Sequence, residues 1–387
     1  MSENRTVARP SVDEAATTAL SLVFQDVETF EDWQKASRRL GAIVSDDGLC
    51  EIAVWTPSLV SNGVAERDVR LELLVPPHGF DTADFHETTR FERVLLPTRR
   101  IGDVTLVAVH GVAAGTRNRC GTFYALSIRE GDGERRVLDP MAASLPFGAF
   151  APAEIYDVEA MLAARDDAEH WQALAGSADG TPTVSPPSNI LQVHVPTATE
   201  GGTLASLTRR IREKAERIRS GAEPSASDAL WLGFDAMQLL PVEPTTVYEA
   251  GPAFWEDIGG EDDRLDVRLR RPDTTNWGYD VVIAGSAAVN PTLLESGRPD
   301  ELVDLACALH TFPGKPIALV FDVVFGHADN QALKVLDHAF LAGANMYGQN
   351  LDYRNPAVRA QMLEMQRRKV NFGADGVRVD GAQDFKW

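Results

Sequence analysis

The chain has 387 residues, 57 of them acidic and 37 basic, so its formal net charge is -20 at pH 7. A chain of this length can hold two domains with a large core. Because a surface this acidic repels nucleic acid and anionic lipid, we expect neither nucleic acid nor a membrane as a partner.

The sequence carries few signs of export. Its start, Met1–Arg5, lacks the basic residues and apolar core of a signal peptide, and no apolar run approaches the roughly 20 residues that span a bilayer. Cys50, Cys120 and Cys307 are odd in number and far apart, which argues against a disulfide scaffold or a cysteine metal site. We expect a soluble, cytoplasmic protein, and the acidic composition also suits a salt-exposed source.

The first part of the chain reads as an all-β domain. Residues 1–24 show no sustained pattern and are predicted to be a flexible N-terminus, and residues 25–150 are predicted to form a β-sandwich that begins with a short helix over Phe30–Leu40. Turn signals separate several short apolar strands. These strands include Leu49–Trp55, Val69–Val75 and Val104–Val109.

Residues 151–188 are predicted to connect two domains. Ala153–Ala175 has helical periodicity, with Ile155, Val158 and Met161 on one side. Gly176–Ser188 is rich in Gly, Ser, Thr and Pro, which is typical of a linker.

From residue 189 onward strands and helices alternate, which predicts a parallel sheet. The predicted helices are Thr203–Arg219, a helix opened by Pro299, and a helix from Asn355 to about Val370. The predicted strands are Asn189–Val195, Phe234–Leu240, Ile317–Val324 and Ala374–Asp380.

Four such units are half of an eight-unit barrel, whose usual length is about 250 residues. The predicted fold class is therefore α/β: an N-terminal β-sandwich followed, over residues 189–387, by the first half of a (β/α)8 TIM barrel truncated after strand four. Half a barrel leaves two unpaired edges, so we expect the natural protein to be longer.

The last two predicted strands carry the candidate chemistry. Asp380 ends a strand, with Arg378 two residues earlier on the same face, so a guanidinium would hold the carboxylate ionised. Asp322 and His327 stand at the carboxyl end of the preceding strand, where the catalytic groups of a β/α barrel gather. Taken singly, a stabilising Asp–Arg pair and a structural histidine are the commoner outcomes.

Tyr279–Asp280, in the long loop after the second strand, adds an aromatic face and an acid, the usual means of holding a sugar ring. Together with the two strand ends, this loop reproduces a familiar set of motifs. Asp322–His327 resembles the first conserved block of glycoside hydrolase family 13, the α-amylase superfamily, and Gly376–Asp380 resembles its second block. Leu351–Arg359 is similar to the segment that leads into that second block, and Trp277–Asp280 resembles the family's loop after strand two.

The resemblance implies roles for these residues. Asp380 would be the catalytic nucleophile and Arg378 its charge partner, while Tyr279, Asp280, His327 and Asp322 would line or support the glucosyl pocket. The family cleaves with retention through a covalent glycosyl-enzyme, which needs a second carboxylic acid about 5 Å away. In the family this acid is a glutamate after strand five, beyond this chain, so we expect the chain alone to be inactive.

Two departures from the family pattern bear on the expected metal site and on the expected substrate. Gly326 replaces the usual asparagine before the histidine, which weakens the case for a calcium site; we assign no metal and no cofactor. Gln383 and Asp384 stand where long-glucan enzymes continue toward lysine and histidine, so we place both at the substrate and expect a small aglycone. The run Ala374–Lys386, with Asn189–Val195, most resembles the glucosylglycerol hydrolases, which cleave 2-O-α-glucosylglycerol to glucose and glycerol.

Three other interpretations were weighed. One is a glucan branching, debranching or trehalose-forming enzyme of the same superfamily. Another is a non-catalytic carbohydrate-binding homologue. The third, a doubly wound nucleotide-binding domain, is disfavoured because Pro196–Glu200 offers no glycine-rich phosphate loop after the first strand. The expected partner is a small α-glucoside substrate, and the oligomeric state is left open.

Overall fold

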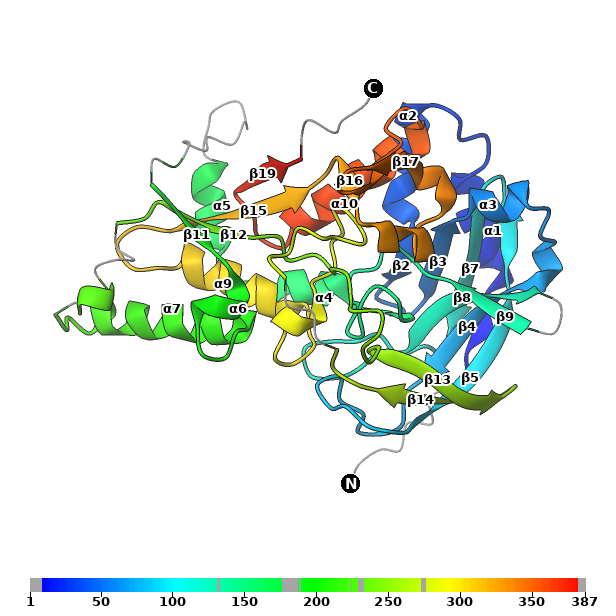
Figure 1. The fold of residues 1–387 in the computed structure, drawn as a ribbon, viewed down its shortest axis with the longest axis horizontal. Helices are drawn as coiled ribbons and strands as arrows, with labels where there is room; N and C mark the ends of the chain where they lie inside the picture. Colours follow the sequence, from blue (N-terminus) through cyan, green and yellow to red (C-terminus); the bar gives the residue numbers. More distant parts are fainter. Residues whose placement is uncertain are drawn as a thin grey trace.

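The described residues form two large antiparallel sheets, one parallel sheet and a small third antiparallel sheet (Figure 1). In this computed structural model the described residues are 9–130, 133–175, 187, 189–223, 225–228, 233–272 and 276–381. The antiparallel sheets lie to the right in Figure 1, and the parallel sheet lies to the left with helices α7 and α9 below it.

The first antiparallel sheet has the strand order β1-β7-β3-β2, and β6 also pairs with β7. Its central strands are buried and mostly apolar, as in Ile52 to Trp55 and Val104 to Val109. The strands are β1 (Ser11–Val12), β2 (Gly41–Val44), β3 (Cys50–Trp55), β6 (Arg99–Ile101) and β7 (Val104–His110).

The second antiparallel sheet has the order β10-β8-β4-β5-β14-β13, with β9 beside β8. The strands are β4 (Val69–Val75), β5 (Thr89–Pro97), β8 (Phe123–Glu130), β9 (Gly133–Val137), β10 (Ala153–Glu154), β13 (Trp255–Glu261) and β14 (Arg264–Leu269). The hairpin β13–β14 comes from the predicted barrel segment, yet β14 pairs with β5. Its alternating apolar side chains Leu265, Val267 and Leu269 are buried on the aromatic core of this sheet.

Residues 9–24 of the stretch predicted to be flexible, 1–24, form a strand and a helix instead. Strand β1 pairs with β7, and helix α1 (Glu14–Val23) follows, capped by the Asp13 side chain on the Ala16 amide. The predicted helix at Phe30–Leu40 is present as α2 (Phe30–Ala36) and the 3₁₀ turn η1 (Ser37–Arg39).

The predicted single helix over Ala153–Ala175 is wrong in part. Its first residues form β10, which pairs with β8 of the sandwich, and two short helices follow: α4 (Val158–Ala163) and α5 (Ala168–Leu174). The break between them is the turn around Asp167, whose carboxylate binds Arg165. The predicted linker at 176–188 lies, apart from residue 187, outside the described residues.

The parallel sheet contains the four strands predicted from the sequence, in the order β11-β12-β15-β19. The register places Asp322 beside Arg378 and Val324 beside Asp380. The strands are β11 (Ile190–Val193), β12 (Ala236–Leu239), β15 (Ala318–Val324) and β19 (Gly376–Asp380). The helices between them are α6 (Val195–Ala198), α7 (Leu204–Arg219), α9 (Asp300–His310) and α10 (Pro356–Val370).

The loop after β15 folds into a small sheet of its own, in the order β16-β18-β17. Its strands are β16 (His327–Ala328), β17 (Leu341–Asn345) and β18 (Gly348–Leu351). The remaining short helices are α3 (Pro57–Ser61), η2 (Glu66–Asp68), η3 (Pro291–Leu293), η4 (Asn330–Lys334) and η5 (His338–Phe340).

One apolar cluster spans the sandwich and part of the parallel-sheet region. Buried residues from the sandwich strands belong to the same apolar cluster as Val281–Ala284 and the buried face of α10. Polar contacts also cross the junction: Arg368 of α10 donates to the Met141 and Leu40 carbonyl oxygens at 3.1 and 2.8 Å. The sandwich and the parallel-sheet region are therefore packed directly against each other.

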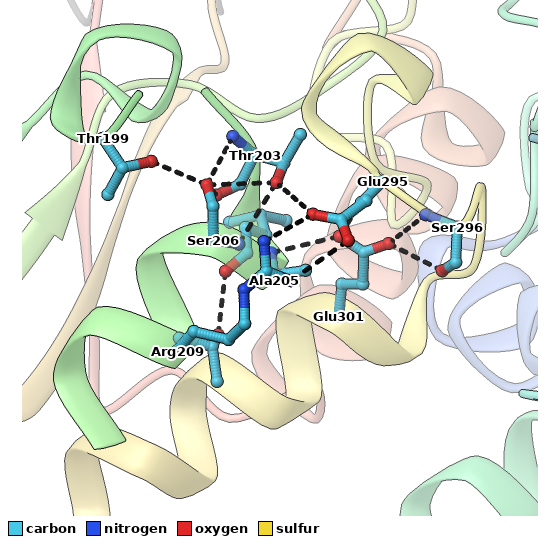
Figure 2. Close-up of polar contacts among 10 residues, drawn as sticks. Thr199, Thr203, Ala205, Ser206, Arg209, Glu295, Ser296 and Glu301 are labelled. Atoms are coloured by element: carbon cyan, nitrogen blue, oxygen red, sulfur yellow. Dashed lines mark hydrogen bonds and ion pairs between the residues drawn. The ribbon is translucent and has the colours of Figure 1, made fainter. Parts of the chain in front are cut away.

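The Glu301 carboxylate and the hydroxyls of Thr203 and Ser206 fix the loop between β11 and α7 (Figure 2). Thr203 caps α7, and the Ser206 hydroxyl accepts from the Thr203 amide at 3.0 Å in return. Glu301, in the first turn of α9, accepts from the amides of Ala205 and Ser296 at 3.1 and 2.6 Å. One carboxylate thus serves the positive ends of two neighbouring helices. Thr203 therefore has a structural role here.

Within the described part of the chain, no helix combines the length and apolarity needed to cross a membrane.

Candidate active site

The site is built around Asp322, a carboxylate buried in the centre of the parallel sheet. Strand β15 is apolar on both faces except at this position, and the Asp322 side chain has no exposure to solvent. An isolated carboxylate there would be costly, so it must be paired and hydrogen-bonded. Three side chains from three different elements supply those bonds.

The first of these side chains is Arg378, which lies beside Asp322 in the register of β15 and β19. Its Nη1 atom lies 2.9 and 3.1 Å from the two Asp322 carboxylate oxygens and donates to the Asp380 carboxylate at 2.6 Å. Residues 378 and 380 share a strand face, which is why one guanidinium reaches both. The pKa of Arg378 is raised, mainly by its hydrogen bond to Asp322 and to a smaller extent by that to Asp380, so the guanidinium stays charged.

The second side chain is Tyr279, whose hydroxyl donates to Asp322 at 2.9 Å. Burial, the larger cause, and this hydrogen bond together raise the pKa of Tyr279 to about 12. The tyrosine is placed by Gly278, which has a φ of +98° and whose Cβ, if present, would lie 2.3 Å from the Pro241 carbonyl oxygen. Only glycine fits this turn without displacing the loop.

The third side chain, Gln238 of β12, was missed in the sequence analysis. Its Nε2 atom donates to Asp322 at 3.0 Å. The signal was present: Gln238 is the one polar residue of the strand Ala236–Leu239. A polar side chain in a buried strand needs a partner, and the adjacent strand offered Asp322.

The other predicted site residues are placed differently. His327 is buried in β16, and its ring stacks on Tyr347 with centroids 5.1 Å apart. Asp280 is exposed, and its backbone carbonyl accepts from the Thr246 amide at 3.0 Å. The network around Asp322 therefore joins Asp380, Arg378 and Tyr279. Gln383 and Asp384 lie outside the described residues.

The two carboxylates of the network have different surroundings. Asp322 accepts from Arg378, Tyr279 and Gln238, so its oxygens are occupied and it serves as an anchor. Asp380 is 33% exposed at the end of β19 and is bound by the same guanidinium through one oxygen, Oδ1. The Asp380 carboxylate is thus paired with a cation, oriented and partly accessible to solvent.

Comparison with known proteins supports the broader class suggested by the motifs, that of the glycoside hydrolases. The model of the family described as hypothetical glycoside hydrolase 5 matches residues 18–387. The chain belongs to this family. It is therefore a domain of glycoside hydrolase type. No curated protein matches the chain in sequence.

Solved structures of amylase and pullulanase type share the fold. A putative α-amylase from Salmonella typhimurium is 18% identical, with a TM-score of 0.57 over 90% of this chain and 44% of its own. A pullulanase from Paenibacillus barengoltzii, in complex with maltohexaose and α-cyclodextrin, is 17% identical, with a TM-score of 0.57 over 96% and 53%. The pullulanase from Bacillus acidopullulyticus is 17% identical, with a TM-score of 0.57 over 93% and 39%. The chain thus spans about half the length of these proteins or less.

The turn at Gly278 leads to a first testable prediction. Gly278→Ala combines a positive φ with a collision against the Pro241 carbonyl, and we expect it to destabilise the protein by about 1–3 kcal/mol. Gly221→Ala is the matched control, since Gly221 has a φ of +73° with no atom within 4 Å of an added Cβ. Thermal unfolding of both variants measures the difference. If both variants lost the same stability, the close approach of residue 278 to the Pro241 carbonyl would not determine the shape of the loop.

Proposed function

We propose that the protein is a retaining α-glucosidase that cleaves a small α-glucoside, 2-O-α-glucosylglycerol, into glucose and glycerol. The observation that carries the proposal is the Asp322–Arg378–Asp380 network at the ends of two neighbouring parallel strands. In it, Asp380 attacks the anomeric carbon of glucose and forms a glycosyl-enzyme, glycerol leaves with a proton from a carboxylic acid, and water then releases glucose.

We further propose that the sheet β11-β12-β15-β19 is the first half of a (β/α)8 barrel. Its four parallel strands are adjacent in chain order, and Asp380 and Arg378 lie on one face of the last one. The other face of β19 carries the exposed Val377 and Val379. They line an apolar groove of about 380 Å³ together with Phe325 and Leu363, which is the kind of surface that a further β/α unit covers.

The proposed roles follow from the network. Arg378 keeps Asp380 ionised and oriented, and Asp322 holds Arg378 in place. Tyr279 is proposed to line the glucosyl pocket together with His327 and Asp280. Gln383 and Asp384 are proposed to contact the glycerol side. The protein is proposed to act in the cytoplasm, without nucleic acid, membrane or cofactor in the reaction.

The test is a comparison of substrates with the full-length enzyme. We expect glucose release from 2-O-α-glucosylglycerol and none from starch or pullulan. Debranching is the second candidate, because pullulanases are among the proteins of similar fold. Faster hydrolysis of pullulan than of glucosylglycerol would establish debranching instead, and specific sugar binding without any turnover would indicate a non-catalytic homologue.

A second prediction concerns the 387-residue chain expressed by itself, which we expect to release no glucose. Asp322 is the carboxylate that the described network joins to Asp380, and its oxygens are occupied by three donors, so it cannot protonate the leaving oxygen. General acid catalysis contributes about 10²–10⁴-fold. Arg378 is also 46% exposed, which weakens the electrostatic field on the nucleophile. A coupled glucose assay checks this, and turnover comparable to that of the full-length enzyme would refute it.

A further inference from the structure

A buried group of two histidines and one aspartate lies at the end of the parallel sheet opposite Asp380. His170 belongs to α5, His310 is the last residue of α9, and Asp375 directly precedes β19. The Nε2 atoms of His170 and His310 lie 2.6 and 2.9 Å from the two carboxylate oxygens of Asp375. The three side chains can each offer one ligand atom within 4.8 Å of the others.

His310 lies between two carboxylates. Its Nδ1 atom lies 2.5 Å from a carboxylate oxygen of Asp167, and its Nε2 atom lies 2.9 Å from a carboxylate oxygen of Asp375. Two carboxylates this close to one imidazole repel each other, and a cation among these groups offsets that repulsion.

The two imidazole rings are arranged to share such a charge. They stack with centroids 3.9 Å apart and an interplanar angle of 10°, so both Nε2 atoms reach the same carboxylate. Two imidazolium ions could not lie this close without repulsion. The side chains of His170, His310 and Asp375 are 10%, 0% and 3% exposed, so water screens the group poorly.

A second layer of contacts fixes the orientation of these side chains. Asp167, the partner of His310, is itself held by Arg165 at 2.9 and 2.6 Å and by the Trp171 indole at 3.0 Å. On the other side, the Leu319 amide donates to the Asp375 carboxylate at 2.7 Å. A carboxylate that orients the far nitrogen of a histidine is the usual outer partner of a metal-binding imidazole. Arg165 balances one of the two carboxylates and leaves one negative charge for a cation.

We propose that His170, His310 and Asp375 bind a divalent transition-metal ion, and that this ion is Zn²⁺. Two imidazole nitrogens and a carboxylate oxygen are a common zinc donor set, with water as the fourth ligand. Tetrahedral bonds of about 2.0–2.2 Å would separate the ligand atoms by about 3.3 Å. The present contacts of 2.6 and 2.9 Å must therefore open by a few tenths of an ångström, which His170, on the short helix α5, can accommodate.

The ion would be structural rather than catalytic. Asp375 and Asp380 are five residues apart on an extended strand, a separation of about 16 Å. The ligands come from α5, α9 and the start of β19, which are distant in sequence, so one ion would fasten the connector after the sandwich to the parallel sheet. Such a cross-link stabilises the folded state by its binding free energy.

The experiment is a Zn²⁺ titration of the metal-stripped full-length protein by calorimetry, with Co²⁺ absorption as a geometric probe. We expect a site with a dissociation constant below ~1 µM, a rise in Tm on binding, and the visible spectrum of tetrahedral Co²⁺. His170→Ala and Asp375→Asn should each remove one equivalent of Zn²⁺. Asp167→Asn should weaken binding by about 10–100-fold, because it alters only the outer partner.

The matched control is His110→Ala, since His110 also contacts an aspartate, Asp13, at 3.1 Å but has an exposed ring. It should leave Zn²⁺ binding unchanged. Circular dichroism of the metal-free variants verifies that they fold. If one ligand variant does not fold, Asp167→Asn still tests the site. A protein that takes up no Zn²⁺, or one whose His170→Ala and Asp167→Asn variants bind it as the unmutated protein does, overturns the proposal; a bridging proton would then hold the group together.

Discussion

Asp380→Asn in the intact enzyme will lower kcat by about 10⁴-fold or more, the scale seen when a covalent nucleophile is removed from an enzyme. The amide has nearly the same shape as the carboxylate and can still approach Arg378, but it cannot form the ester to glucose. Binding should be affected much less, so the loss should appear in kcat rather than in KM. Steady-state kinetics on glucosylglycerol and trapping with a mechanism-based sugar label measure both effects.

Asp266→Asn provides the control for this experiment. Asp266 lies on β14 in an exposed ion pair with Arg90, at 2.7 and 3.0 Å, and belongs to the sandwich sheet. The same chemical change there should alter kcat by less than about twofold, since exposed pairs contribute little. A label attached to a residue other than Asp380, or an Asp380→Asn enzyme with near-normal kcat, would disprove the assignment of the nucleophile.

Lys369→Met will destabilise the protein by about 3–5 kcal/mol, because it leaves a buried carboxylate without its counter-charge. Lys369 in the last turn of α10 contacts Glu243, which follows β12, and both side chains are fully buried. Burial lowers the pKa of Lys369 while Glu243 opposes that change, and the ammonium also lies 5.5 Å from the centroid of the Phe321 ring. Urea unfolding measures the loss.

Two further variants separate the charge effect from packing. Lys369→Met combined with Glu243→Leu should recover much of the loss, since replacing a whole buried pair by apolar residues is often neutral. Lys334→Met removes an equivalent ammonium from the exposed pair with Glu249 and should change stability by less than about 1 kcal/mol. If Lys369→Met were no more harmful than Lys334→Met, the buried pair would not support the packing of α10 against the sheet.

Local patterns predicted most elements of the parallel-sheet region. The helix from Asn355 to about Val370 is α10, because Asn355 caps it through the Ala357 amide at 3.0 Å and Pro356 opens it. The almost continuous apolar run at Ile317–Val324 is β15, since a strand buried on both faces needs that composition. The strand-end acids and Arg378 could also be located, because strand periodicity alone places residues 378 and 380 on one face.

Contacts between distant segments could not be predicted in this way. The hairpin Trp255–Leu269 joins the sandwich through β5, more than 160 residues earlier in the chain. The alternation of apolar and polar residues in the hairpin does not specify which apolar surface it covers. Ala153–Glu154 looks helical in its local context, but pairing with β8 makes it a strand.

The sequence by itself determined the family motifs, the alternation of strands and helices and the chemical types at the site, because each depends on residues close together in the chain. Only the tertiary structure decided which groups meet. It joined Gln238, Tyr279 and Arg378 on one carboxylate, it placed His327 against Tyr347, and it assembled His170, His310 and Asp375. The physical reason is that hydrogen bonds and ion contacts act over about 3 Å in space, whatever the separation along the chain.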